Sequence, residues 1–311
     1  MMARKVLIAT EKPFATSARD QVVQILKVAG YEALLLESYT DRADLLRAVA
    51  DADAMIIRSD KVDAEVLAAA KNLKLVVRAG AGYDNVDCAA AKAAGAAVMN
   101  TPGQNANAVA ELVFGMMVYM ARGKFSGKSG TELRGKTLGI HAVGNVGRAV
   151  ATIAKGYGMK VLGFDPYVEA EAVKAAGAEP VNSVEQLYAK SNYVSLHIPA
   201  TAETKQSIGR KLLASMPKSG CLVNTARKEV IHEHELLEVL EQRSDLRYAT
   251  DIAPSDDVAK VLHDKHADRV YMTPKKMGAQ TAEANTNAGI AAANQIVGFF
   301  ERGEKKFIVN P

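Results

Sequence analysis

Short runs of apolar, β-branched residues alternate with segments of helical periodicity along nearly the whole chain. Continuous apolar runs of this length are typical of strands that are buried on both faces of a sheet. The pattern predicts strands at 5–9, 33–36, 54–58, 75–78 and 97–99, and a second series at 137–141, 160–164, 193–197, 221–224, 247–250 and 269–272. Because strand–helix alternation requires crossover connections, the expected fold class is α/β with parallel, doubly wound sheets.

The two series of strands indicate two domains, and a chain of 311 residues is long enough to build both. The first series ends near Asn100, and a helical pattern at 105–120 follows it. A polar, glycine-rich stretch at 122–135 then precedes the next strand. A long, alanine-rich helix is expected at 281–302 and could cross back to the first domain.

Composition and charge exclude several classes of function. The net charge of +4 is spread along the chain and aromatic residues are scarce, so no nucleic-acid partner is expected. No apolar run approaches the roughly 20 residues of a membrane span, and no signal peptide precedes the first strand, which favours a cytoplasmic protein without a membrane partner. No metal site is expected from the two distant cysteines, nor from four histidines placed beside a helix start or on a solvated helix: His232, His234, His263 and His266.

A dinucleotide-binding turn is indicated at 138–148, where a strand, a tight turn and a helix follow one another. Gly144 would let the backbone approach a pyrophosphate and Gly147 would let helix and strand pack closely, although Ala142 replaces the first glycine of the usual fingerprint. Asp165 ends the next strand about 20 residues later, where a carboxylate binds ribose hydroxyls and favours NAD over NADP. The alternative is a purely structural turn. The expected cofactor contacts at the helix start also include Asn145 and Val146.

A second glycine-containing loop, at 78–84, also follows a strand. It lacks a third glycine and a following acid, so it does not fit a nucleotide loop. The backbone amides of Ala79 and Gly80 could instead receive the carboxylate of a substrate.

Four segments stand in order around the dinucleotide turn: AGAGYDNVD at 79–87, NTPG at 100–103, HIP at 197–199 and VNTAR at 223–227. Together they resemble the D-2-hydroxyacid dehydrogenases, and the resemblance covers nearly the whole chain. It implies a flavodoxin-like substrate domain at 1–99 plus 282–311 and a Rossmann NAD-binding domain at 100–281. Catalysis in this family takes place in the cleft between the two domains.

The resemblance also assigns roles to polar residues at strand ends. Arg227 lies just past a predicted strand, where its fork could hold a carboxylate and polarise the neighbouring carbonyl while hydride arrives; the alternative is a surface arginine. Asp251 resembles the family aspartate near the nicotinamide amide. Further cofactor contacts are implied for His197, Pro199, Thr204 and Ala226.

The chain departs from the family at its acid–base group. The family carries a histidine in a Thr-Pro-His-Ile-Gly segment, whereas residues 273–281 read TPKKMGAQT, and the glutamate that pairs with the histidine is also absent. Lys275 takes the histidine's place when counted from Pro274, and Lys276 when counted back from Gly278. An ammonium group needs no carboxylate partner to donate a proton. The pattern resembles a lysine-type subgroup of phosphoglycerate dehydrogenases; the alternative is a structural lysine pair.

Recognition of a substrate phosphate is expected from strand-end cations of the first domain. Arg58 matches the family segment, but Asp60 replaces a residue that is often basic, and Arg78 is a second candidate. Either arginine could instead be a solvated cation. The expected substrate-binding residues are Arg58, Ser59, Arg78, Ala79, Gly80 and Asn100.

The expected reaction is NAD-dependent oxidation of 3-phospho-D-glycerate to 3-phosphohydroxypyruvate, the first step of serine biosynthesis. Alternatives are another 2-keto acid, such as glyoxylate or hydroxypyruvate, and, more remotely, an NAD-sensing corepressor-like protein. A homodimer is expected through the helix at 105–120 and the stretch after it. No room is expected after the last helix for a serine-binding regulatory domain.

Overall fold

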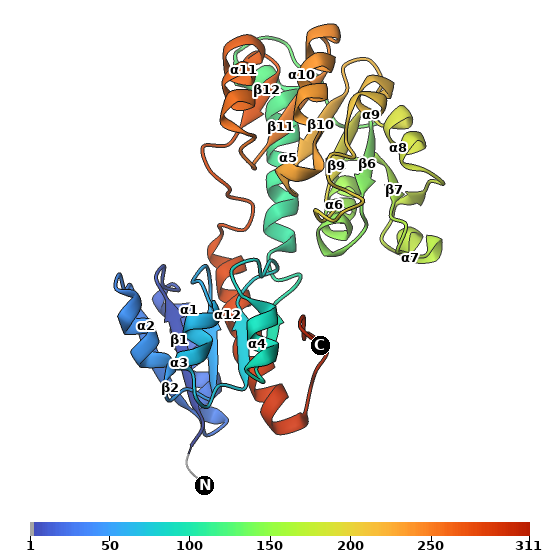
Figure 1. Cartoon of the computed structure of the whole chain (residues 1–311). Coiled ribbons are helices and arrows are strands. Elements are labelled where there is room, and N and C mark those ends of the chain that lie inside the picture. Colours follow the sequence, from blue (N-terminus) through green and yellow to red (C-terminus); the bar gives the residue numbers. More distant parts are fainter. Residues whose placement is uncertain (1–2) are drawn as a thin grey trace. The chain divides into compact units, whose positions relative to one another are not determined.

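The computed structural model describes residues 3–311 and divides the chain into two compact units (Figure 1). One unit contains the chain up to Asn105 together with Gln280–Pro311. The other contains Ala106–Ala279. Each unit has its own parallel sheet with helices on both faces.

The N-terminal unit is built on a five-stranded sheet in the order β2-β1-β3-β4-β5. Its strands are β1 (Lys5–Thr10), β2 (Glu32–Glu37), β3 (Ala54–Ile57), β4 (Leu75–Arg78) and β5 (Ala97–Asn100). Every pairing is parallel. This order is the flavodoxin-like form of a doubly wound sheet, whose ligands bind beyond the carboxyl ends of the strands.

Helices cover both faces of this sheet because successive side chains of a strand point to opposite sides. Val6 and Ile8 of β1 pack with α1 (Thr16–Val28) and α12 (Ala282–Arg302), which lie side by side. Leu7 and Ala9 face α2 (Arg42–Val49), α3 (Ala64–Ala69) and α4 (Cys88–Ala93). Helix α12, red in Figure 1, therefore belongs to the same core as the first strand of the chain.

The second unit contains a seven-stranded parallel sheet in the order β12-β11-β10-β9-β6-β7-β8. Its strands are β6 (Thr137–His141), β7 (Lys160–Phe164), β8 (Glu179–Pro180), β9 (Tyr193–Leu196), β10 (Cys221–Asn224), β11 (Arg247–Thr250) and β12 (Val270–Met272). Counted from β6, six of them have the Rossmann order 3-2-1-4-5-6, and β12 extends the edge. The order reverses between β6 and β9, so a ligand crevice is expected beside β6.

The helices of this unit also form two layers. On one face α5 (Ala106–Ala121) and α6 (Asn145–Gly156) pack against β6 and β10, and α7 (Ala170–Ala175) lies next to β8. On the other face lie α8 (Val184–Lys190), α9 (Arg210–Ser215) and α10 (Glu233–Gln242), with α11 (Asp256–His266) beside β12. Two short 3₁₀ turns, η1 (Gly123–Phe125) and η2 (Lys228–Val230), follow α5 and β10.

The predicted fold class of two parallel, doubly wound sheets is confirmed. Strand β8, which is only two residues long, was not among the predicted strands. The expectation that His266 lies on a solvated face is wrong: its side chain is buried in the same row of α11 as Val258 and Leu262. None of the helices within residues 3–311 combines the length and apolar character needed to cross a membrane.

Candidate active site

The turn between β6 and α6 has the geometry of a dinucleotide-binding turn. Gly144 is the N-cap of α6 and has no side chain, so the N–H groups of the first helical turn stay available to an anion. A Cβ added to Gly144 would have open space around it. A Cβ added to Gly147 would lie 2.2 Å from the carbonyl oxygen of Ala142, so helix and turn touch there. These observations fit a bound pyrophosphate at this helix start.

Ala142 occupies the position of the missing fingerprint glycine and adopts the backbone conformation that glycine favours, with φ of 81°. Its N–H donates to the carbonyl oxygen of Phe164 at 2.9 Å, which ties the turn to the end of β7. Alanine at this position therefore adopts a conformation that glycine favours, at a cost in local backbone strain.

Asp165 follows β7 and lies directly beside the turn. Its Oδ2 accepts a hydrogen bond from the N–H of Val143 at 2.9 Å, and its Oδ1 accepts one from the N–H of Tyr167 at 2.9 Å. A carboxylate has about four acceptor positions, so both oxygens can still accept from hydroxyl groups. The structure thus brings Asp165 to the edge of the glycine turn that the sequence singled out.

Two histidines lie at the carboxyl ends of the neighbouring strands β6 and β9. His141 ends β6, and the N–H of His197 donates to its carbonyl oxygen at 2.9 Å. Ser195 Oγ lies 2.9 Å from His197 Nε2, and Tyr188 Oη lies 3.4 Å from His141 Nδ1. Burial lowers the pKa of His141 to about 4. Burial also lowers the pKa of His197 to about 3, and the neighbouring His141 contributes a smaller part of that shift. Both rings are therefore neutral at pH 7.

The segment after β9 forms a compact turn. Thr204 Oγ1 donates to the carbonyl oxygen of Pro199 and accepts from the N–H of Thr201 at 2.7 Å. The ring of Pro199 is exposed. Two expected cofactor contacts, Pro199 and Thr204, are thus joined in one exposed turn that follows His197.

Arg227 lies three residues beyond the end of β10, and its loop is held by a residue to which the sequence analysis gave no role. Asn224 is buried; its Oδ1 accepts from the N–H of Ala226 at 3.0 Å, and its Nδ2 donates to the carbonyl oxygen of Arg227 at 3.0 Å. The carbonyl oxygen of Asn224 also accepts from the N–H of Asp251 at 3.2 Å. The signal was present, since Asn224 belongs to the VNTAR segment.

Asp251 is buried at the end of β11, beneath the segment that carries the two lysines. Its Oδ2 accepts from the N–H of Gly278 at 2.8 Å, while no group within residues 3–311 hydrogen-bonds to its buried Oδ1. Burial raises the pKa of Asp251, and the Gly278 N–H and the charge of Lys276 oppose that rise. Lys276 is therefore near enough to act on this carboxyl group.

The lysine segment is also fixed at its other end. The N–H of Thr273 donates to the carbonyl oxygen of Thr250 at 3.0 Å, and its hydroxyl donates to the carbonyl oxygen of Lys275 at 2.8 Å. The side chains of Lys275 and Lys276 are both exposed. The segment is thus held across the carboxyl ends of β11 and β12.

In the N-terminal unit, Arg58 is already engaged. Its guanidinium donates to the carbonyl oxygens of Lys12 and Pro13 at 2.7 and 2.9 Å and to Asn285 Oδ1 at 2.6 Å, and it stacks over the ring of Phe14. Burial lowers the pKa of this guanidinium. Ser59, the next residue, is exposed.

The loop after β4 is folded around its own arginine. Arg78 Nε donates to the carbonyl oxygen of Arg58 at 3.0 Å, and its guanidinium crosses Gly80 so closely that an added Cβ would lie 1.5 Å from Nη1. The N–H groups of Ala79 and Gly80 donate to the carbonyl oxygens of Ile57 and Arg78, both at 2.8 Å. The two amides expected to receive a substrate carboxylate are therefore engaged inside the unit.

Asn100 holds the same loop from the end of β5. Its Nδ2 donates to the carbonyl oxygen of Ala81 at 2.6 Å, and its own carbonyl oxygen accepts from Gln295 Nε2 of α12 at 3.0 Å. No acceptor within the described part of the chain takes the N–H of Ala81 or Gly82. The amides of Ala81 and Gly82 are therefore available to a ligand, whereas the sequence had pointed to the amides of Ala79 and Gly80.

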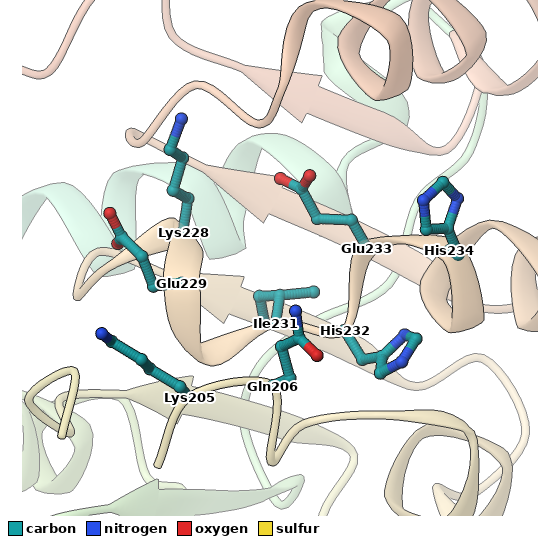
Figure 2. Close-up of a pocket in the computed structure, with 8 residues that line it drawn as sticks. All are labelled: Lys205, Gln206, Lys228, Glu229, Ile231, His232, Glu233 and His234. Atoms are coloured by element: carbon teal, nitrogen blue, oxygen red, sulfur yellow. The ribbon is translucent and has the colours of Figure 1, made fainter. Parts of the chain in front are cut away.

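A pocket of about 370 Å³ lies beside the segment that follows Arg227 (Figure 2). Lys205 belongs to the turn after β9 and Lys228 to η2, and the rings of His232 and His234 point in different directions (Figure 2). Its lining residues, which include none of the predicted site residues, are Lys205, Gln206, Lys228, Glu229, Ile231, His232, Glu233 and His234.

Comparison with known proteins agrees with this architecture. Residues 108–275 match the sequence profile described as "D-isomer specific 2-hydroxyacid dehydrogenase, NAD binding domain". A D-3-phosphoglycerate dehydrogenase of Methanocaldococcus jannaschii is 36% identical over 295 residues, covering 89% of this chain and 55% of that protein. The chain thus spans about half the length of that relative.

Two further relatives match over nearly their full length. A hydroxypyruvate reductase of Thermotoga maritima is 35% identical over 285 residues, covering 85% of this chain and 90% of that protein. The crystal structure of an NAD⁺-bound 3-phosphoglycerate dehydrogenase of Entamoeba histolytica superposes with a TM-score of 0.88 at 44% identity, covering 100% of this chain and 99% of that one.

The profile covers more than half of the chain and includes the β6 turn, Asp165, Arg227 and Asp251. The cofactor expected from the sequence, NAD, is confirmed by the domain that this profile describes. The chain belongs to the D-isomer specific 2-hydroxyacid dehydrogenase family.

Proposed function

We propose that this protein catalyses the reversible, NAD-dependent oxidation of 3-phospho-D-glycerate to 3-phosphohydroxypyruvate, the entry reaction of serine biosynthesis. The observation that carries the proposal is the cluster at the carboxyl ends of β10, β11 and β12, where Asn224 links the loops of Arg227 and Asp251, and Asp251 links to the lysine segment. The two relatives that are named phosphoglycerate dehydrogenases support the choice of substrate.

NAD would be held by the β6–α6 turn and Asp165. The free N–H groups at the start of α6 would bind the pyrophosphate, and Asp165 would accept from the adenosine ribose hydroxyls. The buried Oδ1 of Asp251 would accept from the nicotinamide amide, which would satisfy an oxygen that otherwise has no donor. When bound, NAD supplies the hydride acceptor.

Arg227 would bind the substrate carboxylate and polarise the oxygen at the reacting carbon. Its planar fork can donate two parallel hydrogen bonds to a carboxylate, which a lysine cannot reproduce. In the N-terminal unit, the free amides of Ala81 and Gly82 would help to hold the substrate, and Arg78 and Arg58 would face its phosphate.

Lys276 is the stronger candidate for the acid–base group. Its charge acts on Asp251, and it lies two residues before Gly278, whose N–H binds that carboxylate. Within residues 3–311, the carbonyl oxygen of Lys275 accepts from the hydroxyl of Thr273, and no hydrogen bond or ion pair links the Lys275 side chain to the cluster. An ammonium group at Lys276 would deliver the proton that the keto oxygen gains as hydride reaches carbon.

A second function, reduction of an unphosphorylated 2-keto acid such as hydroxypyruvate, has one observation in its favour. The guanidinium of Arg58 already makes three hydrogen bonds inside its own unit, which reduces its capacity to bind a phosphate. The Thermotoga relative named hydroxypyruvate reductase matches over 90% of its length.

The test is NADH consumption by the purified protein with phosphohydroxypyruvate, hydroxypyruvate and glyoxylate. We expect the highest kcat/KM with phosphohydroxypyruvate; a higher value with hydroxypyruvate would favour the second function. Lys276→Ala should lower kcat roughly 10²–10⁴-fold with little change in KM for NADH, whereas the matched Lys275→Ala should be nearly silent. Equal losses in the two variants, or none, would contradict the assignment.

We also propose a homodimer that forms through α5 and the segment after it. Gly123, Lys124 and Phe125 all adopt positive φ, and the ring of Phe125 is 66% exposed although it contacts the ring of Tyr119. An exposed aromatic ring beside the apolar helix α5 could contribute to a contact surface between two subunits.

A further inference from the structure

Asp60 is buried and joins the ends of three strands. Its Oδ1 accepts from the N–H of Glu11 at 2.7 Å and from the hydroxyl of Tyr39 at 2.9 Å, and its Oδ2 accepts from the N–H of Arg58 at 3.0 Å. These donors follow β1, β2 and β3, whose carboxyl ends share one edge of the sheet. One carboxylate therefore fixes three neighbouring loops to one another.

A fourth loop joins at the same place. Asn85, which lies beyond β4, donates through Nδ2 to the carbonyl oxygens of Asp60 at 2.7 Å and Arg58 at 3.2 Å. Arg78 Nε donates to the same carbonyl oxygen of Arg58 at 3.0 Å. The main chain at 58–60 is thus the point where both candidate phosphate-binding arginines are anchored.

Asp60 also controls the loop that the Arg58 side chain grips. The Arg58 guanidinium donates to the carbonyl oxygens of Lys12 and Pro13, and this loop begins at Glu11, whose N–H is bound by Asp60. The Asp60 carboxylate therefore holds both the main chain of Arg58 and the loop whose carbonyl oxygens bind the Arg58 guanidinium. Any shift of Asp60 would move the two together.

The environment of Asp60 suits a positioning role and excludes direct contact with a ligand. The residue is 1% exposed, and both of its oxygens have donors. Burial and the adjoining carboxylate raise the pKa of Tyr39, so its hydroxyl keeps its proton and donates. A buried carboxylate is tolerated only with such donors, so loss of any one of them disturbs the whole junction.

We propose that Asp60, with Tyr39 as its partner, is a positioning residue that sets Arg58 and Arg78 for the phosphate end of the substrate. The inference rests on the proposed function, because it requires a phosphorylated 2-hydroxy acid. It also assigns a role to the residue that stands where the family is often basic: Asp60 orients the cations and supplies no charge to the ligand.

The test compares KM values for phosphohydroxypyruvate and hydroxypyruvate. In Asp60→Asn the amide nitrogen cannot accept from the N–H of Arg58, so we expect KM for phosphohydroxypyruvate to rise about tenfold. We expect kcat, KM for NADH and KM for hydroxypyruvate to change by less than about twofold. Tyr39→Phe removes one donor and should raise the same KM about threefold.

Asp53→Asn is the matched control. Asp53 Oδ2 accepts from the N–H of Lys5 at 2.7 Å at the amino-terminal end of the same sheet, so its loss should lower the melting temperature and leave every KM unchanged. The inference is overturned if Asp60→Asn behaves like Asp53→Asn, or if it raises KM for both substrates equally. If Asp60→Asn does not fold, an unchanged KM in Tyr39→Phe overturns it instead.

Measurements on the wild-type protein distinguish failure of the proposed function from failure of the positioning role of Asp60. If it reduces hydroxypyruvate but not phosphohydroxypyruvate, the proposed function fails and the positioning role fails with it. If it prefers phosphohydroxypyruvate and the variants keep that preference, only the positioning role fails.

Discussion

The same substitution should destabilise the fold at one glycine of the β6–α6 turn and leave stability nearly unchanged at the other. In Gly147→Ala the new Cβ would lie 2.2 Å from the carbonyl oxygen of Ala142 and 3.0 Å from Ile140 Cγ2. In Gly144→Ala the new Cβ meets no atom within 4 Å, and φ of −76° suits any residue. One substitution therefore adds a methyl group to a packed contact, and the other adds it to the space where a pyrophosphate would approach.

The contact distance sets the magnitude for Gly147→Ala. Carbon and carbonyl oxygen approach to about 3.3 Å, so the start of α6 must move by about 1 Å. The carbonyl of Ala142 cannot swing away easily, because the N–H of Val143 belongs to the same planar peptide group and donates to Asp165 Oδ2 at 2.9 Å. Overpacking of this kind costs 1–3 kcal/mol, and a clash with backbone belongs near the upper end, at about 3 kcal/mol.

The assay combines thermal unfolding with steady-state kinetics. Gly147→Ala should lower the melting temperature and raise KM for NADH, since a shift of about 1 Å at such a site can cost on the order of 100-fold. Gly144→Ala should change the free energy of unfolding by less than about 0.5 kcal/mol, yet raise KM for NADH at least about tenfold. The reasoning would be refuted if Gly147→Ala unfolded at the wild-type melting temperature. It would also be refuted if both variants lost the same free energy of unfolding.

Four further predictions follow from named contacts. Ala142→Gly should raise the free energy of unfolding by about 0.5–1 kcal/mol in urea titrations, because it relieves a positive φ; a loss would contradict the strain. His141 and His197, with pKa values of about 4 and about 3, bind protons only when the chain unfolds, so stability should fall as pH drops from about 6.5 toward 4, by roughly 1.4 kcal/mol per pH unit for each histidine. Equal urea midpoints at pH 7 and pH 5 would disprove this. Asp165→Ala should reduce the preference for NAD over NADP, measured as a ratio of kcat/KM values, and comparable wild-type values would exclude its proposed role. Phe125→Asp should shift the protein from dimer to monomer in sedimentation, and a wild-type monomer would overturn the dimer.

The strands and the family could be predicted from the sequence because both depend on local patterns. Parallel strands buried on both faces need continuous apolar runs, and the runs at 75–78 and 221–224 coincide with β4 and β10. The dinucleotide turn was also local, since the spacing of its glycines and Asp165 follows from one strand–turn–helix–strand unit. His266 was within reach of the same reasoning, because it repeats the four-residue spacing of Val258 and Leu262.

The two-residue β8 lay below the length at which such a pattern can be recognised. The roles of the polar residues at strand ends could not be predicted for a different reason, because their hydrogen-bond partners come from distant parts of the sequence. Asp60 looked like a lost phosphate ligand, whereas its carboxylate is bound by groups from positions 11, 39 and 58. Ala79 and Gly80 looked like free donors, but their N–H groups are already engaged.

Sequence alone therefore determined the two sheets, the family and the turn that we propose binds NAD, because each depends on residues that are close together along the chain. Only the tertiary structure decided which polar groups are used within the protein and which remain for a ligand. At the edge of a parallel sheet, loops separated by tens of residues become neighbours, and hydrogen bonds between them, such as those of Asp60 and Asp251, have no local pattern.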